Sequence, residues 1–116
     1  MPGLVGALGL WSAGLVFAGW RILGRRGLRI SAIHLPITAG AIIWTSTAPI
    51  DPFDRRLLGF VICVVDATVH AIRLQRCGKR MGITPNTQST LNLLLGFTVA
   101  GAIPSLAAAA LLNYAF

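Results

Sequence analysis

The chain has 116 residues, of which 55% are hydrophobic and 11% are charged, and ten Arg and Lys against three Asp give a net charge of +7. A soluble domain has about 25% charged residues, so this chain has too few to cover a water-facing surface. The composition excludes intrinsic disorder, a collagen-like repeat and a disulfide scaffold, and with a mean hydropathy of +0.76 it predicts a multi-pass membrane protein.

Four apolar runs follow one another along the chain, each near the ~20 residues that a transmembrane helix needs. They cover approximately residues 4–23, 30–50, 57–74 and 91–112. Only short polar segments separate them. The expected fold is therefore an all-α membrane protein, a four-transmembrane-helix bundle with short loops that forms a single integral membrane domain over residues 1–116.

The first and fourth runs are rich in small residues. The first is uncharged until Arg21 and has no basic segment before it, so we read it as a retained helix and not as a secretory signal. Small residues let transmembrane helices approach closely. The residues expected to mediate helix packing, either between these two runs or with another subunit, are Gly14, Ala18, Gly101, Ser105 and Ala109.

Basic residues gather in two of the three connecting segments, 21–29 and 73–80, while segment 51–56 balances two Arg with two Asp. If all four runs span the membrane, the two basic segments lie on one side and both termini on the other. The positive-inside rule then places the termini on the non-cytoplasmic side, in a bacterial inner membrane or a bacterium-derived organelle membrane. The residues expected to set topology and contact anionic headgroups are Arg25, Arg26, Arg29, Lys79 and Arg80.

Local signals predict where the last two helices begin and end. Pro52 is suited to the first position of the third helix, and Gly78 is a suitable stop for it. Residues 82–90 are expected to form a loop, after which Ser89 or Thr90 would cap the fourth helix.

Ionisable residues inside the runs are the most informative feature. Asp66 and His70 are four residues apart in the third run and so share one helix face. Ser31, His34 and Thr38 form a matching stripe on the second run. Because these two runs are antiparallel neighbours, we expect a polar intramembrane network that joins Asp66, His70 and His34.

Three interpretations of this network are open, since an ionisable group in the bilayer is a functional-site hypothesis by default. The first is a buried network that only fixes helix register. The second is ligation of a haem or a chlorophyll-type pigment by His34 and His70, with Arg73 and Arg76 as partners of haem propionates. The third is a proton or cation relay through Asp66 and His70.

No soluble-enzyme motif is present: the chain lacks GxxxxGK[ST], GxGxxG, HExxH and GxSxG patterns. We therefore expect no catalysis by this chain. The favoured function is an accessory subunit of a larger membrane complex, of the energy-converting or electron-transfer kind found in a respiratory chain. Expected partners are other membrane subunits and anionic or bound lipids, and not nucleic acid. A haem- or pigment-bearing subunit and a small ion- or proton-conducting or holin-like pore are the alternatives.

Overall fold

Four long helices make up the structure, a computed structural model that describes residues 2–47 and 52–115 and, within them, the side chains of 6–44, 58–108 and 111. The helices are α1 (Pro2–Leu23), α2 (Arg25–Thr47), α3 (Pro52–Met81) and α4 (Pro85–Ala115). Each contains a stretch long and apolar enough to cross a membrane. The sequence-based prediction of an all-helical chain with four helices long and apolar enough to span a membrane is thus confirmed.

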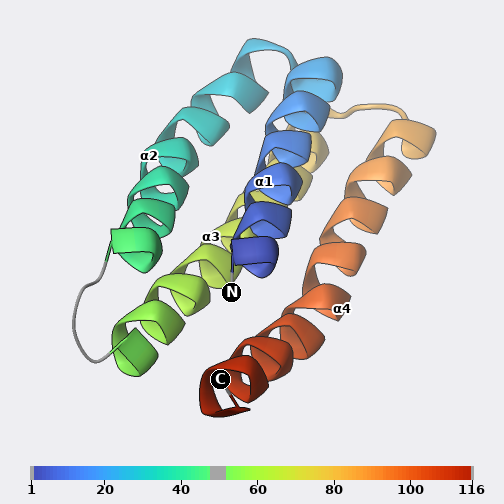
Figure 1. The fold of residues 1–116 in the computed structure, drawn as a ribbon. Coiled ribbons are helices and arrows are strands. Elements are labelled where there is room, and N and C mark those ends of the chain that lie inside the picture. The colour runs from blue at the N-terminus through green and yellow to red at the C-terminus, as the bar shows by residue number, and fades with distance from the viewer. Residues whose placement is uncertain (1, 48–51, 116) are drawn as a thin grey trace.

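The helix α3 occupies the centre of the arrangement and packs against each of the other three helices. Of the helix pairs that are in contact, α1 and α4 touch least. The two chain ends lie at one end of the bundle, and the α1–α2 and α3–α4 connections lie at the other (Figure 1). The bundle therefore has one end that carries both termini and one that carries two short turns.

The α1–α2 connection is a single residue, Gly24, whose φ of 64° lies in the left-handed region that glycine tolerates best. Its N–H donates to the carbonyl of Trp20 at 2.9 Å, which completes α1. The expected polar linker before residue 30 does not exist, because α2 begins at Arg25. The hairpin closes tightly, since a Cβ at Gly27 would overlap the carbonyl group of Gly19.

The prediction that Gly78 ends the third helix is wrong, because α3 continues to Met81. The helix ends at Gly82, which has a φ of 67°. There the N–H of Ile83 donates to the carbonyl of Gly78 at 3.4 Å, and the N–H of Gly82 donates to that of Lys79 at 3.3 Å; this is a Schellman motif. Gly78 serves a different purpose: a Cβ there would lie 2.7 Å from Leu91, so its small size lets α4 approach.

The predicted loop over 82–90 is also shorter in the structure, because α4 begins at Pro85. Thr84 caps the helix: its Oγ1 accepts the N–H of Thr87 at 3.4 Å. Ser89 and Thr90 lie exposed within the helix and are not its cap. Proline at the first helical position lacks an N–H that would need a partner and has a helical φ, which favours the earlier start.

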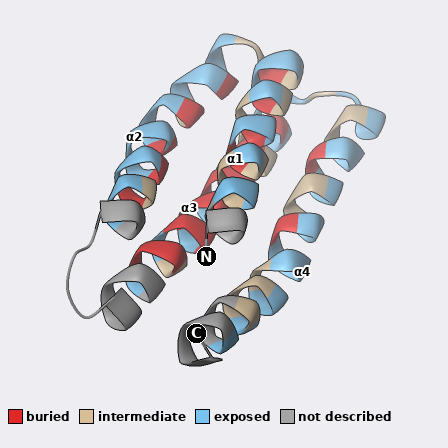
Figure 2. Ribbon diagram, in the orientation of Figure 1, coloured by how far each residue is buried: buried red, intermediate tan, exposed pale blue. Residues whose placement is uncertain are grey.

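The interior is small and lies along α3. Its larger cluster consists of Leu15, Leu23, Ala67, Ala71, Leu74 and Leu91, and a smaller one contains Phe60 and Val64. Buried positions face inward on each helix, while exposed ones cover the outside (Figure 2). Many large apolar side chains are exposed, among them Phe17, Ile103 and Leu111. Such an exterior suits lipid and not water.

Candidate functional site

Six polar side chains meet between α2 and α3, and we call this group the polar seam: Ser31, His34, Thr38, Asp66, His70 and Arg73. Three come from each helix at spacings of three or four residues, which puts each set on one helix face. All except Arg73 are buried, with exposed fractions from 1% for Ser31 and His70 to 6% for Thr38 and Asp66. The structure thus brings together the two polar stripes of the sequence.

Asp66 is the anionic centre of the seam, and both of its oxygens accept hydrogen bonds. Its Oδ1 lies 2.6 Å from Nδ1 of His34. Its Oδ2 accepts the hydroxyl of Thr38 at 2.7 Å. Hydrogen bonds to a carboxylate are stronger than those between neutral groups, and here they offset part of the cost of burying a charge.

The protonation of His34 follows from its second partner, Arg73. Nη1 of Arg73 lies 3.1 Å from Nε2 of His34. A guanidinium can only donate, so Nε2 must accept and carries no proton. Nδ1 then holds the ring proton and donates it to Asp66. His34 is therefore a neutral imidazole that links a cation to an anion, and the charges of this trio sum to zero.

His70 lies against His34 with the two rings stacked, their centroids 4.8 Å apart and their planes 9° from parallel. Nε2 of His70 is 2.8 Å from the hydroxyl oxygen of Ser31. This second pair extends the seam from the depth of Asp66 toward the end that carries the turns.

The geometry does not fit the expectation that His34 and His70 bind one haem iron between them. Axial ligands point their nitrogens at a shared metal from opposite sides, whereas stacked rings point theirs sideways. Both nitrogens of His34 already have protein partners, and Arg73 is held by His34 instead of being free for a propionate. Arg76 is exposed on α3. Within the described parts of the chain, no three His, Cys, Asp or Glu side chains gather as metal ligands.

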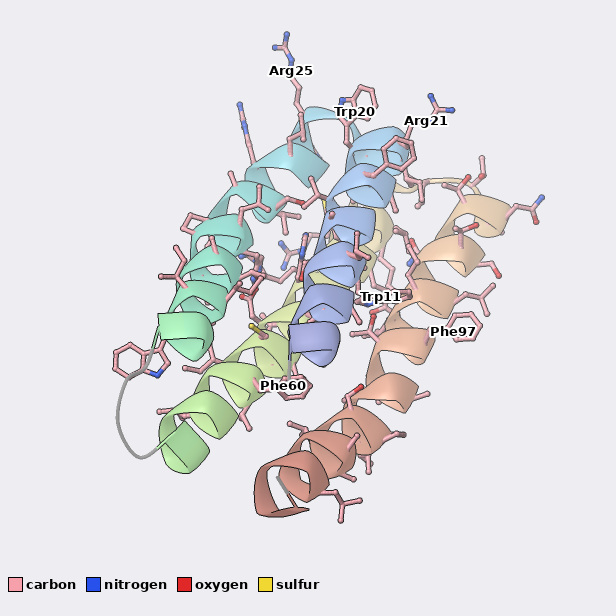
Figure 3. The ribbon with its side chains drawn as sticks, in the orientation of Figure 1. Trp11, Trp20, Arg21, Arg25, Phe60 and Phe97 are labelled. Atoms are coloured by element: carbon pink, nitrogen blue, oxygen red, sulfur yellow. The ribbon has the colours of Figure 1, made fainter. Side chains whose placement is uncertain are left out.

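A second feature is an open cavity between α1 and α4, which we call the α1–α4 groove. Its volume is about 530 Å³, and it is lined by Ala7, Leu8, Trp11, Val64, Ala67, Phe97, Thr98, Gly101, Ala102 and Ser105. Nε1 of Trp11 donates to the hydroxyl of Thr98 at 2.8 Å and joins the two helices. Trp11 and Phe97 are seen beside α1 and α4 in Figure 3.

The residues predicted to mediate helix packing divide between the groove and the surface. Gly101 and Ser105 line the groove, and no atom outside its own helix lies within 4 Å of a Cβ placed on Gly101 or on Gly14. Ala18 is half-buried, and the side chain of Ala109 lies outside the described residues. Among the described glycines, the one whose added Cβ would overlap the backbone of another helix is Gly27, against Gly19, and the sequence analysis singled out neither residue.

The exposed cations predicted to set topology gather at the end with the turns. Arg25 projects from this end in Figure 3, as does Arg21. We call it the basic end. The predicted topology residues Arg25, Arg26 and Arg29 at the start of α2, and Lys79 and Arg80 at the end of α3, are exposed there.

A cluster of amides at the α3–α4 interface was missed by the sequence analysis. Nε2 of Gln88 donates to the carbonyl of Gln75 and to Oδ1 of Asn92, both at 3.2 Å, and Nε2 of Gln75 donates to the same Oδ1 at 3.0 Å. The four-residue spacing of Gln88 and Asn92 was the available signal. Their partner on α3 could not be inferred without the position of α4.

Comparisons with protein families, with curated proteins and with solved structures found no match to this chain.

Proposed function

We propose that this chain is a non-catalytic, multi-pass accessory subunit of a larger membrane complex, and that the α1–α4 groove receives a transmembrane helix of a partner subunit. The observation that carries the proposal is the groove itself. Its walls are apolar, and Gly101 and Ser105, four residues apart on α4, leave room for another helix. Small residues at this spacing are typical of transmembrane helix interfaces.

The outer face of α4 supports the same proposal. Leu93, Val99 and Ile103, none of which lines the groove, are exposed to 59%, 49% and 77%. Within the chain, α4 is attached chiefly to α3, with the Trp11–Thr98 hydrogen bond as a link to α1. The polar seam, by contrast, satisfies its own hydrogen bonds and offers a partner little to bind. A partner would therefore be expected on the α4 side.

We further propose that the basic end faces the cytoplasm of a bacterial inner membrane or the equivalent side of a bacterium-derived organelle membrane. Exposed Arg and Lys residues at the end with the turns support this orientation through the positive-inside rule. Both termini would then lie on the non-cytoplasmic side. Reporter fusions to each terminus test this: activity of a reporter that works only in the cytoplasm would contradict it.

The test of the subunit proposal is extraction of the tagged chain from its native membranes in mild detergent, followed by native electrophoresis and mass spectrometry of the species that results. We expect a complex larger than the chain, with another membrane protein at fixed stoichiometry. Components of an energy-converting assembly are the partners that the proposal favours. A chain that migrates as a monomer and co-purifies with nothing would overturn the proposal.

A matched pair of variants tests whether the groove is the contact. Gly101→Leu fills the groove, whereas Gly96→Leu adds the same side chain to an exposed α4 position that does not line it. We expect Gly101→Leu to lose the partner and Gly96→Leu to keep it. Loss of the partner in both variants, or in neither, would mean that the groove is not the binding surface and that lipid fills it.

A further inference from the structure

We propose that the polar seam is a proton-binding site, in which uptake of one proton at Nε2 of His34 releases Arg73 from the seam toward the basic end. This inference is independent of the proposed subunit function. It rests on the hydrogen-bond directions within the seam, which fix where each proton lies, and on its charge balance, which favours one place for an additional proton.

The starting state holds one positive and one negative charge. Arg73 donates to Nε2 of His34, and Nδ1 of His34 donates to Oδ1 of Asp66. Thr38 donates to the other carboxylate oxygen. Asp66 therefore balances the charge of Arg73 through a neutral ring, although the two charged groups do not touch directly.

An added proton can bind to Asp66 or to His34, and the two choices differ in the charges that they leave in the seam. On Oδ1 of Asp66 it would face the N–H of His34. On Oδ2 it could be donated to the hydroxyl of Thr38, which also accepts hydrogen bonds, but Asp66 would then be neutral and would no longer balance the charge of Arg73. If His34 turned to its other tautomer to accept from Asp66, its Nε2–H would face the guanidinium of Arg73. Protonation of Asp66 therefore removes the anion of the seam, whereas protonation of Nε2 of His34 retains it.

Protonation of Nε2 makes His34 an imidazolium that donates from both nitrogens. Asp66 then neutralises His34 directly through the existing 2.6 Å contact. Arg73 loses its acceptor and meets a like charge, so it becomes the surplus cation. A third, unbalanced charge in the bilayer costs several kcal/mol, which favours its departure.

Arg73 is placed to leave. It is the only member of the seam that is not fully buried, and it lies one turn before exposed Arg76 on α3, toward the basic end. Long Arg side chains readily extend their charged group to the membrane surface. One proton thus enters the seam as one guanidinium charge leaves it, and the seam stays neutral in both states.

The other ionisable groups around His34 are few. On α3 they are His70, stacked on the ring, and Cys63, buried one turn from Asp66. On α2 the cations are Arg25, Arg26 and Arg29, all exposed. Helix α1 contains only Arg21, and α4 contains no ionisable side chain before Tyr114. Asp66 is the only acid among the side chains that the structure describes, so none of these offers Arg73 a second anion once His34 is charged.

The direct experiment is nuclear magnetic resonance of the full chain, labelled with ¹⁵N at histidine and arginine, in lipid nanodiscs over the range in which histidines titrate. At high pH we expect His34 to show a protonated Nδ1 and an unprotonated Nε2, with a through-space contact to Arg73. At low pH we expect both nitrogens protonated and loss of that contact. A His34 Nε2 that is protonated throughout, or an Arg73 contact that persists after His34 is charged, would overturn the proposal.

A matched pair of variants provides the control. His34→Gln retains one donor and one acceptor but does not titrate, so the contact with Arg73 should persist across the whole pH range. His70→Gln should leave the pH-dependent loss of the Arg73 contact intact. Loss of the contact at low pH in His34→Gln would assign the effect to another group, such as Asp66, and would contradict the proposal.

Discussion

The polar seam and the α1–α4 groove occupy two faces of the same helix, α3, and differ in every respect that matters for association in lipid. In the seam, Asp66 and His34 each have two hydrogen-bond partners within the chain. In the groove, Ala67, the neighbour of Asp66, faces a cavity of about 530 Å³. The face of α3 in the seam has its hydrogen bonds made within the chain, whereas the face in the groove is open.

The difference shows how a small membrane protein can be both rigid and able to bind. Lipid tails are as apolar as the side chains, so apolar surface alone does not hold helices together in a bilayer. Directional polar contacts fix α2 against α3. The groove lacks such polar contacts along most of its length. A partner helix can therefore pack into it.

The largest effect is expected at the centre of the seam. Asp66→Ala leaves Arg73 and His34 without their anion, and breaking a buried charged network in this way costs about 3–5 kcal/mol. The measurement is the free energy of unfolding in a titration with a denaturing detergent. As a control, replacing Asp66, His34 and Arg73 together with Leu should cost less than the single change. A single variant more stable than the triple variant would contradict the view that the seam is an interdependent unit.

The next effect in size is expected where α1 meets α2. Gly27→Ala places a Cβ against the carbonyl of Gly19, and such overpacking costs about 1–3 kcal/mol. Gly14→Ala is the matched control, because no atom lies within 4 Å of its added Cβ. Since alanine has a higher helix propensity than glycine, this variant should be more stable than the natural protein by up to about 1 kcal/mol. Equal effects on the unfolding free energy would show that the tight contact does not lie at Gly27.

A smaller effect is expected at the one hydrogen bond across the groove. In a double-mutant cycle of Trp11→Phe and Thr98→Val, we expect a coupling energy of about 0.6 kcal/mol, the average for such bonds in a membrane protein. The unfolding free energies of the two single variants and the double variant give this value. A coupling of zero would mean that the groove is held open without the Trp11–Thr98 bond.

The smallest effect is expected inside the groove. Gly101→Leu meets open space, so beyond the helix cost of glycine, which the matched variant Gly96→Leu measures, it should change stability by no more than about 0.5 kcal/mol. The unfolding free energies of the two isolated variants should therefore be similar even where Gly101→Leu has lost partner binding. A large loss of stability would show that the groove closes in the isolated chain.

The sequence predicted the features that depend on spacing along one helix. The stripes through His34 and Asp66 identified two faces, and the antiparallel order of two neighbouring spans then implied that they meet. The start of α3 at Pro52 also agrees with its prediction. Periodicity is a property of the chain itself, so it needs no knowledge of the other helices.

Features that depend on the distance between helices could not be predicted in this way. Gly78 is of the residue type that often ends a helix, yet in the structure it makes room for Leu91 of α4. The small residues of α1 include both Gly14 and Gly19, and only the position of α2 shows that Gly19 is the one in close contact. The role of Arg73 was likewise hidden, because its hydrogen bond to His34 depends on how far α2 and α3 are apart.

The one-residue connection at Gly24 also affects the bilayer itself. Because α2 begins at once and carries Arg25, Arg26 and Arg29 in its first two turns, its uncharged part is shorter than the helix. With 31 residues against 23, α4 is about 12 Å longer than α2. A helix longer than the local hydrocarbon thickness tilts, and a shorter one draws the bilayer thinner around it. If both helices span the bilayer, we therefore expect the membrane to be thinner beside α2 than beside α4.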